Sequence, residues 1–134
     1  ALKLVADFPE QSFVVDHIAK PRIGERLFSP WQEDLTALAK YPNVWCKLSG
    51  LVTEAKWKQW QPDDFRGYLD VVFEAFGAGR LMLGSDWPVC TLSGNYQATL
   101  RLIMDYVQPF ATEVCDGIFG GNCATFYNLN PKAE

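Results

Sequence analysis

The sequence has no run of about 18 consecutive apolar residues, and its first residues lack the basic segment and long apolar stretch of a signal peptide. We therefore expect a cytoplasmic protein. Positive charge is also scarce, because 12 Lys and Arg residues stand against 16 Asp and Glu residues, giving a formal charge of −4. Such a chain offers no basic surface for phosphate groups, so we expect neither nucleic acid nor a membrane among its partners.

Cysteine and histidine are sparse as well. The four cysteines, Cys46, Cys90, Cys115 and Cys123, form no C-x-x-C pair, which argues against a disulfide framework or a structural zinc site. We expect reduced thiols that pack as small hydrophobic side chains. Hydrophobic residues make up 49% of the chain, enough to bury a core, and no linker divides the sequence, so we expect a single domain over 1–134.

The first residues of the chain have the pattern expected for the end of a helix. Leu2 to Ala6 reads like the last turns of a helix that stops before Pro9, and no initiator Met is present. This pattern indicates that the sequence is a partial domain of a longer chain.

Three short apolar runs predict strands that are buried on both faces, as in a parallel sheet. They span residues 13–15, 44–46 and 81–83, and their first residues lie 31 and 37 residues apart, the length of a strand, a crossover helix and two loops. Ser29 is expected to cap the first intervening helix, with Pro30 as its first residue. Helical periodicity predicts helices over 30–41, 62–76, 96–107, 111–118 and 122–127. The order predicts an α/β fold with a parallel sheet and right-handed crossovers.

Polar residues follow all three predicted strands, and the two most informative are His17 and Asp86. Reactive groups of parallel α/β folds gather beyond the carboxyl ends of the strands, so we expect both side chains at one rim. A lone histidine is more often structural, but directly after a buried strand it can donate to a carbonyl oxygen, bind a metal or hold a water. A partly desolvated carboxylate at Asp86 suits a general base, the alternative being a helix cap.

Three further residues near these strand ends are candidates for substrate binding. Lys47 and Ser49 could steer an anionic or hydroxyl-rich substrate, although Lys47 could equally form a structural ion pair. Trp87, directly after Asp86, could wall one side of the site, although core packing is the usual role of such aromatic residues.

The segments 15–21, 47–51 and 84–89, read as VDHIAKP, KLSGL and GSDWPV, resemble the last three strand ends of the amidohydrolase 2 family. The closing GNCATFY over 121–127 is similar to the final helix of that family. Within the family, the chain looks most like the sugar-lactone hydrolases of the L-fuconolactonase type, relatives of 2-pyrone-4,6-dicarboxylate lactonase. The resemblance covers essentially the whole chain.

This resemblance implies a TIM-type (β/α)₈ barrel, a fold of about 250 residues, of which the chain would hold strands six to eight with their helices. His17 then matches the histidine that ends the sixth strand, and Asp86 matches the aspartate that ends the eighth. The family's first-strand His-x-His pair has no counterpart here. The implied partners are a small-molecule lactone and the missing N-terminal half of the barrel, or a second copy of the chain, because a partial barrel has open sheet edges.

The implied reaction is the opening of a sugar or dicarboxylate lactone by activated water, with Asp86 as the general base and His17 polarising the carbonyl or completing a metal site. One divalent metal, zinc by preference, is implied for the full-length protein, held by His17 and Asp86 together with the missing His-x-His pair. One histidine and one aspartate do not make a three-ligand zinc site, so we expect no metal and no lactonase activity for the chain alone.

Two interpretations from other classes stay open at this point. The chain could be a complete small α/β domain that binds a ligand or partner without catalysis. It could also be a half-barrel with a purely structural role. The oligomeric mass in solution separates these from a partial enzyme, because a half-barrel should associate whereas a complete domain can stay monomeric.

Overall fold

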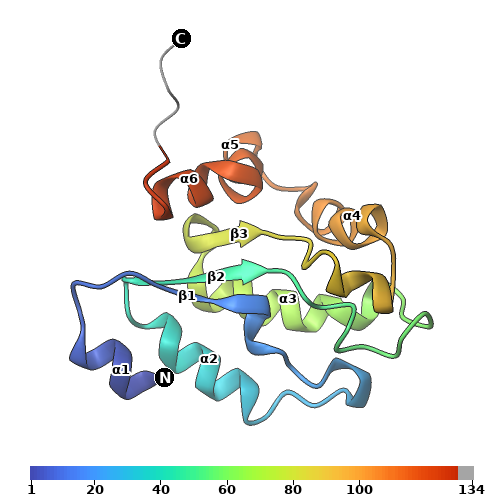
Figure 1. Cartoon of the computed structure of the whole chain (residues 1–134), viewed down its shortest axis with the longest axis horizontal. Helices are drawn as coiled ribbons and strands as arrows, with labels where there is room; N and C mark the ends of the chain where they lie inside the picture. Colours follow the sequence, from blue (N-terminus) through green and yellow to red (C-terminus); the bar gives the residue numbers. More distant parts are fainter. Residues whose placement is uncertain (130–134) are drawn as a thin grey trace.

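The computed structural model describes residues 1–129, so residues 130–134 of the expected domain lie outside the described part. Three parallel strands, β1 (Phe13–Val15), β2 (Val44–Leu48) and β3 (Leu81–Leu83), form one sheet in the order β1-β2-β3 (Figure 1). The predicted α/β fold with a parallel sheet is therefore confirmed. The strand β2 runs two residues further than predicted because Lys47 and Leu48 pair with β3.

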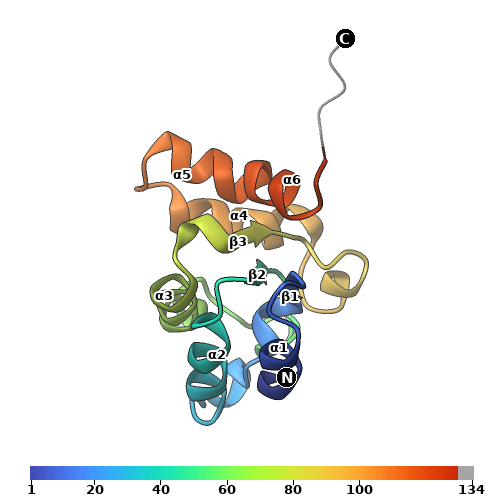
Figure 2. The ribbon, with the colours of Figure 1, turned by 90° about the vertical axis from the view of Figure 1, so that its left-hand side faces the viewer.

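The helices alternate with these strands. They are α1 (Leu2–Asp7), α2 (Trp31–Ala39), α3 (Asp63–Phe76), α4 (Tyr96–Val107), α5 (Thr112–Asp116) and α6 (Asn122–Phe126). Short 3₁₀ turns lie at Asp16–Ala19, Ile23–Glu25, Ala78–Arg80 and Val89–Leu92, and a π-helical turn lies at Gly117–Gly121. In Figure 2, α2 and α3 lie together on the lower left side of the sheet, whereas α5 and α6 lie above β3.

One face of the sheet packs against the helices to form the core. Along β2, the buried residues alternate with half-buried ones, so Val44, Cys46 and Leu48 point to the same side. They join a cluster with apolar side chains of α2, α3 and α4, among them Leu35, Phe65, Leu69, Val72, Leu102 and Ile103. The opposite face of the sheet carries Trp45, whose indole packs edge-on against Phe126 of α6.

The cysteines pack largely as expected. Cys46 and Cys90 are buried, Cys115 and Cys123 are half-buried, and all four are free thiols. Burial raises the pKa of the Cys46 thiol to about 12, so this side chain is an inert part of the core at neutral pH.

Several predicted helix ends lie one or two residues away from the observed ones. The helix α2 starts at Trp31, one residue later than predicted, and no side-chain hydrogen bond from Ser29 caps it. Its first turn is instead anchored by Trp31, whose indole packs against Phe28 and Tyr68. The closing pair is also less separate than predicted, because the π-helical turn joins α5 to α6 without a break.

Two side chains tie the amino ends of the strands to the helices. The guanidinium of Arg80 donates hydrogen bonds to the carbonyl groups of Ala39, Tyr41, Val44 and Phe76, at distances from 2.8 to 3.1 Å. The amide of Asn122 donates to the carbonyl groups of Ala78 and Leu81, at 2.8 and 2.7 Å. These bonds fix the end of the sheet opposite to the polar strand ends.

The sheet has open edges at β1 and β3 among residues 1–129, since β2 is the strand paired on both sides. Unpaired edges of this kind are sites where further strands can add. Among the same residues, no helix has the length and apolar character needed to cross a membrane.

We predict that Arg80→Met lowers the free energy of unfolding by about 2–4 kcal/mol, because several carbonyl groups lose a charged donor. Urea unfolding followed by circular dichroism measures this change. Arg101→Met, on the exposed face of α4, is the matched control and should have little effect. Equal stabilities for the two variants would show that the Arg80 hydrogen bonds contribute nothing.

Candidate active site

The carboxyl ends of all three strands bend through left-handed backbone conformations. His17 follows β1 with a φ of 54°, Gly50 follows β2 with a φ of 64°, and Asp86 follows β3 with a φ of 56°. Glycine adopts this conformation readily, whereas histidine and aspartate do so at a cost in free energy. Strain at the two candidate catalytic residues is typical of positions where geometry serves a function.

The structure brings His17 and Asp86 together, as the sequence predicted. The imidazole Nε2 lies 3.6 Å from Asp86 Oδ1, and the side chains are 27% and 12% exposed. The other ring nitrogen, Nδ1, is hydrogen-bonded to Ser49 Oγ at 2.8 Å. The three side chains come from three different strand ends, so the site exists only when the sheet is assembled.

One carboxylate oxygen of Asp86 has no partner in the described part of the chain. Its Oδ2 atom is buried and has no hydrogen-bond partner among residues 1–129. A buried carboxylate oxygen without a partner carries a desolvation cost, which a substrate, a water or a metal ion can relieve. This atom is therefore the strongest sign of a ligand position in the described part of the chain.

The turn that carries His17 is held from both sides. Residues 17–20 all have positive φ, including the β-branched Ile18 at 44°. The side chain of Ile18 is fully buried, and its carbonyl accepts a hydrogen bond from Trp31 Nε1 at 2.6 Å. These contacts stabilise a backbone conformation that the residues would not adopt alone.

Two glycines make room for the site. A Cβ atom on Gly50 would lie 2.7 Å from the Cβ of His17, and one on Gly84 would lie 3.1 Å from the Cβ of Ser49. Side chains at these positions would push the imidazole and the hydroxyl apart.

The predicted substrate-binding residues occupy different surroundings. Lys47 forms an ion pair with Asp16, with Nζ 2.7 Å from Oδ1. This hydrogen bond is the main cause that raises the pKa of Lys47, while partial burial acts in the opposite direction. Lys47 also lies 5.9 Å from the ring centre of Tyr127. Its charge is therefore already paired within the chain.

Ser49 and Trp87 lie at opposite extremes of burial. Ser49 is 3% exposed and lies behind the imidazole of His17, a geometry that favours an action through the ring over the direct substrate contact expected from the sequence. Trp87 is 66% exposed beside Asp86, where its contact with a substrate remains a prediction.

The sequence patterns indicated neither the roles of Gly50 and Trp31 nor Asp16 as the partner of Lys47. A Ser-Gly step directly after a strand is the signal that could have indicated Gly50, because such a step allows a sharp left-handed bend. No local signal marks Trp31, since its partner Ile18 lies 13 residues away.

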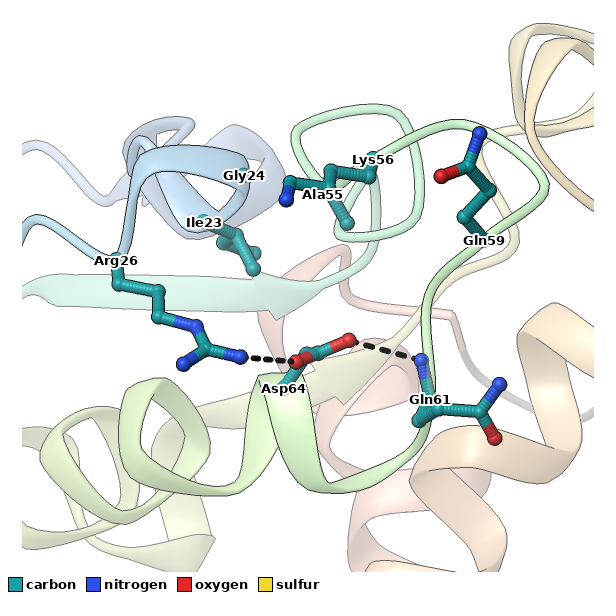
Figure 3. Close-up of a pocket in the computed structure, with 8 residues that line it drawn as sticks. All are labelled: Ile23, Gly24, Arg26, Ala55, Lys56, Gln59, Gln61 and Asp64. Atoms are coloured by element: carbon teal, nitrogen blue, oxygen red, sulfur yellow. Dashed lines mark hydrogen bonds and ion pairs between the residues drawn. The ribbon is translucent and has the colours of Figure 1, made fainter.

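A separate polar hollow of about 300 Å³ lies on the loops that follow β1 and β2 (Figure 3). Asp64 lies at its centre, 3.7 Å from Arg26 Nη2 and accepting a hydrogen bond from the Gln61 backbone at 2.9 Å. Neither His17 nor Asp86 lines this hollow. It is therefore distinct from the candidate active site.

Residues 1–129 contain no group of three or more His, Cys, Asp or Glu side chains placed to hold a metal ion. His17 and Asp86 nevertheless form a nitrogen and oxygen donor pair of the kind that zinc binds, and Asp86 Oδ2 is free. The two residues fit part of a metal-ligand set, which residues 1–129 do not complete.

Comparison with known proteins identifies the family. The amidohydrolase family model matches residues 1–129. The chain is 37% identical over 131 residues to an L-fucono-1,5-lactonase of Burkholderia multivorans, and 40% identical over 129 residues to an L-fucono-1,5-lactonase of Burkholderia ambifaria. The chain belongs to the amidohydrolase family.

A solved structure extends this likeness to three dimensions. An amidohydrolase from Burkholderia multivorans with bound zinc matches 96% of the chain at 35% identity, with a TM-score of 0.91. The match spans 48% of that protein, and the chain spans 44% and 43% of the two lactonases. The predicted fold class, part of a (β/α)₈ barrel, is confirmed.

We predict that Gly50→Ala displaces His17 and destabilises the fold by about 1–3 kcal/mol, because alanine meets both the left-handed backbone and the Cβ of His17. Nuclear magnetic resonance of the single histidine and urea unfolding report the two effects. Gly79→Ala, where an added Cβ meets nothing within 4 Å, is the control. An unchanged His17 signal in Gly50→Ala would contradict the close packing described above.

Proposed function

We propose that this chain forms the Asp86 side of the active site of a hydrolase that opens a sugar lactone with an activated water. The observation that carries the proposal is the unpartnered, buried Oδ2 of Asp86 beside the imidazole of His17. The lactonases to which the chain is similar support this reaction class. Because the chain spans less than half of their length, the activity belongs to a complete barrel in which the open edges of β1 and β3 are paired.

Asp86 acts as the general base in this proposal. Its free oxygen accepts a proton from water as the water oxygen forms a bond to the lactone carbonyl carbon. The bond between that carbon and the ring oxygen then breaks, and the proton held by Asp86 passes to the departing alkoxide. The products are the carboxylic acid and the hydroxyl group of the opened ring, so atoms and charges balance.

His17 stabilises the charge that develops during this attack. Its Nε2 faces the same space as Asp86, so a hydrogen bond from Nε2 can reach the carbonyl oxygen as that oxygen becomes negative. The strained turn and the Ser49 contact keep the ring in place before the substrate arrives. A prepositioned donor of this kind costs no reorganisation at the moment of reaction.

A divalent metal, zinc in the first instance, is part of the proposal for the complete barrel, since the similar Burkholderia multivorans structure contains zinc. His17, through Nε2, and Asp86 are the residues of this chain that would hold it, and an ion there would replace the hydrogen bond from Nε2 to the carbonyl oxygen. When bound, such an ion acts as a Lewis acid and lowers the pKa of a coordinated water. The remaining ligands would lie outside this chain.

The substrate is a small hydroxylated lactone in this proposal. Trp87 offers an exposed apolar face beside Asp86, suited to stacking against a sugar ring. Lys47 contributes to an anionic or polar group only if the ligand competes with Asp16 for its ammonium group. The pairing therefore favours a neutral sugar lactone over a dicarboxylate.

We predict that Asp86→Asn, in the complete barrel protein that contains this chain, lowers kcat for a sugar lactone about 10²- to 10⁴-fold with the fold retained. The amide keeps the size of the side chain but cannot accept the proton. A pH-stat assay with L-fucono-1,5-lactone, run with and without zinc, measures the rate.

Asp105→Asn, on the exposed face of α4, should keep the parental rate and serves as the control. Parental turnover in Asp86→Asn would remove Asp86 from the mechanism. A barrel protein that opens no sugar lactone, with or without zinc, would overturn the proposed reaction and favour a non-catalytic binding role.

A further inference from the structure

Ser49 is the one buried serine that contacts the candidate catalytic pair directly. Its Oγ lies 2.8 Å from His17 Nδ1, and the whole residue is 3% exposed. The position of Ser49 is fixed by its backbone, since Gly84 N–H donates to the carbonyl of Leu48 at 3.2 Å and continues the pairing of β2 with β3. The contact is thus built into the sheet.

The close packing leaves the imidazole little freedom. Gly50 lies against the Cβ and Cγ of His17, and Gly84 lies against Ser49, so a side chain at either glycine would clash with the pair. With Nδ1 held at Ser49, the opposite nitrogen, Nε2, has to face Asp86. The direction of the ring is therefore set by a hydrogen bond and by two glycines.

The charges around the ring decide which partner donates. If Nδ1 carried the proton of the neutral ring, the lone pair of Nε2 would face the carboxylate of Asp86 at 3.6 Å, and the Ser49 hydroxyl would lose Nδ1 as its acceptor. If Ser49 donates to Nδ1, the proton sits on Nε2 and points at the carboxylate. The second arrangement places opposite partial charges together and satisfies the hydroxyl group.

We infer that Ser49 is a positioning residue that donates a hydrogen bond to Nδ1 of His17 and so holds the neutral ring with its proton on Nε2, on the side of Asp86, where the proposed substrate carbonyl would be bound. This inference rests on the proposed function for its purpose, because a proton on Nε2 is what polarises a lactone carbonyl. The hydrogen bond itself is testable without any activity.

The test uses the fact that the chain has a single histidine. Long-range ¹H–¹⁵N spectra of the chain, at a pH where the ring is neutral, show which nitrogen carries the proton. We expect protonated Nε2 in the parent chain. In Ser49→Ala the Nδ1 resonance should move, because its lone pair loses the donor, and the second tautomer should gain population.

Ser93→Ala is the matched control, because Ser93 is 2% exposed and its Oγ has no hydrogen-bond partner among residues 1–129. That variant should leave both ring nitrogens unchanged. If Ser49→Ala does not fold, Ser49→Cys preserves the size of the side chain with a weaker donor and should show a smaller movement of Nδ1. A parent ring protonated on Nδ1, or ring resonances that Ser49→Ala or Ser49→Cys leaves unmoved, would overturn the inference.

A kinetic measurement in the complete barrel separates this role from simple packing. We expect Ser49→Ala to lower kcat about 10- to 100-fold, the usual effect of losing a residue that orients a catalytic group, with KM nearly unchanged. Equal kcat values in Ser49→Ala and Ser93→Ala would contradict the positioning role. If no lactone is turned over at all, the proposed function fails while the spectra still decide the hydrogen bond.

Discussion

The close approach of His17 to Asp86 depends on an unfavourable backbone conformation at the carboxyl ends of β1 and β3. Both residues have left-handed backbone conformations, which for side chains other than glycine cost free energy. The cost is met by contacts on either side, such as the buried Ile18 side chain and the hydrogen bond from Trp31. Without this support, the imidazole and the carboxylate would relax away from each other, and the site would not form.

The electrostatics of the rim divide into two pairs with different roles. The first pair, Lys47 with Asp16, is a closed ion pair, in which Nζ lies 2.7 Å from Oδ1 and the two charges compensate each other. The second pair, His17 with Asp86, is open, because 3.6 Å separates Nε2 from Oδ1 and the other carboxylate oxygen has no partner among the described residues. An open, partly desolvated pair is suited to exchange a proton with a ligand, whereas a closed pair mainly holds the structure.

Contacts at the amino ends of the strands stabilise the sheet and so help to position the site at the opposite end. Arg80 and Asn122 bind carbonyl groups at the amino ends of the strands, and the apolar face of β2 packs on α2, α3 and α4. These contacts fix the register that puts three strand ends side by side. The open edges of β1 and β3, together with a span of less than half of the similar lactonases, accord with a sheet that continues in a complete barrel.

Local sequence patterns predicted the strands, because apolar runs are short-range signals. They also predicted the convergence of His17 with Asp86, because each residue closely follows a strand of a parallel sheet. The same patterns could not predict that Ser49 faces the imidazole instead of the substrate. That contact joins residues 32 positions apart and depends on the bend at Gly50. The pairing of Lys47 with Asp16 was left open for the same reason, and the start of α2 was misplaced because Trp31 is anchored by tertiary contacts.

The central claim, that His17 and Asp86 act as one unit on one ligand, is tested most directly by a double-mutant cycle. The measured quantity is kcat/KM for a sugar lactone in the complete barrel protein, for His17→Gln, Asp86→Asn and the double variant. If the two residues act together, the double variant loses little more than the worse single variant. Losses that multiply would show that the two side chains act independently, and would contradict the account.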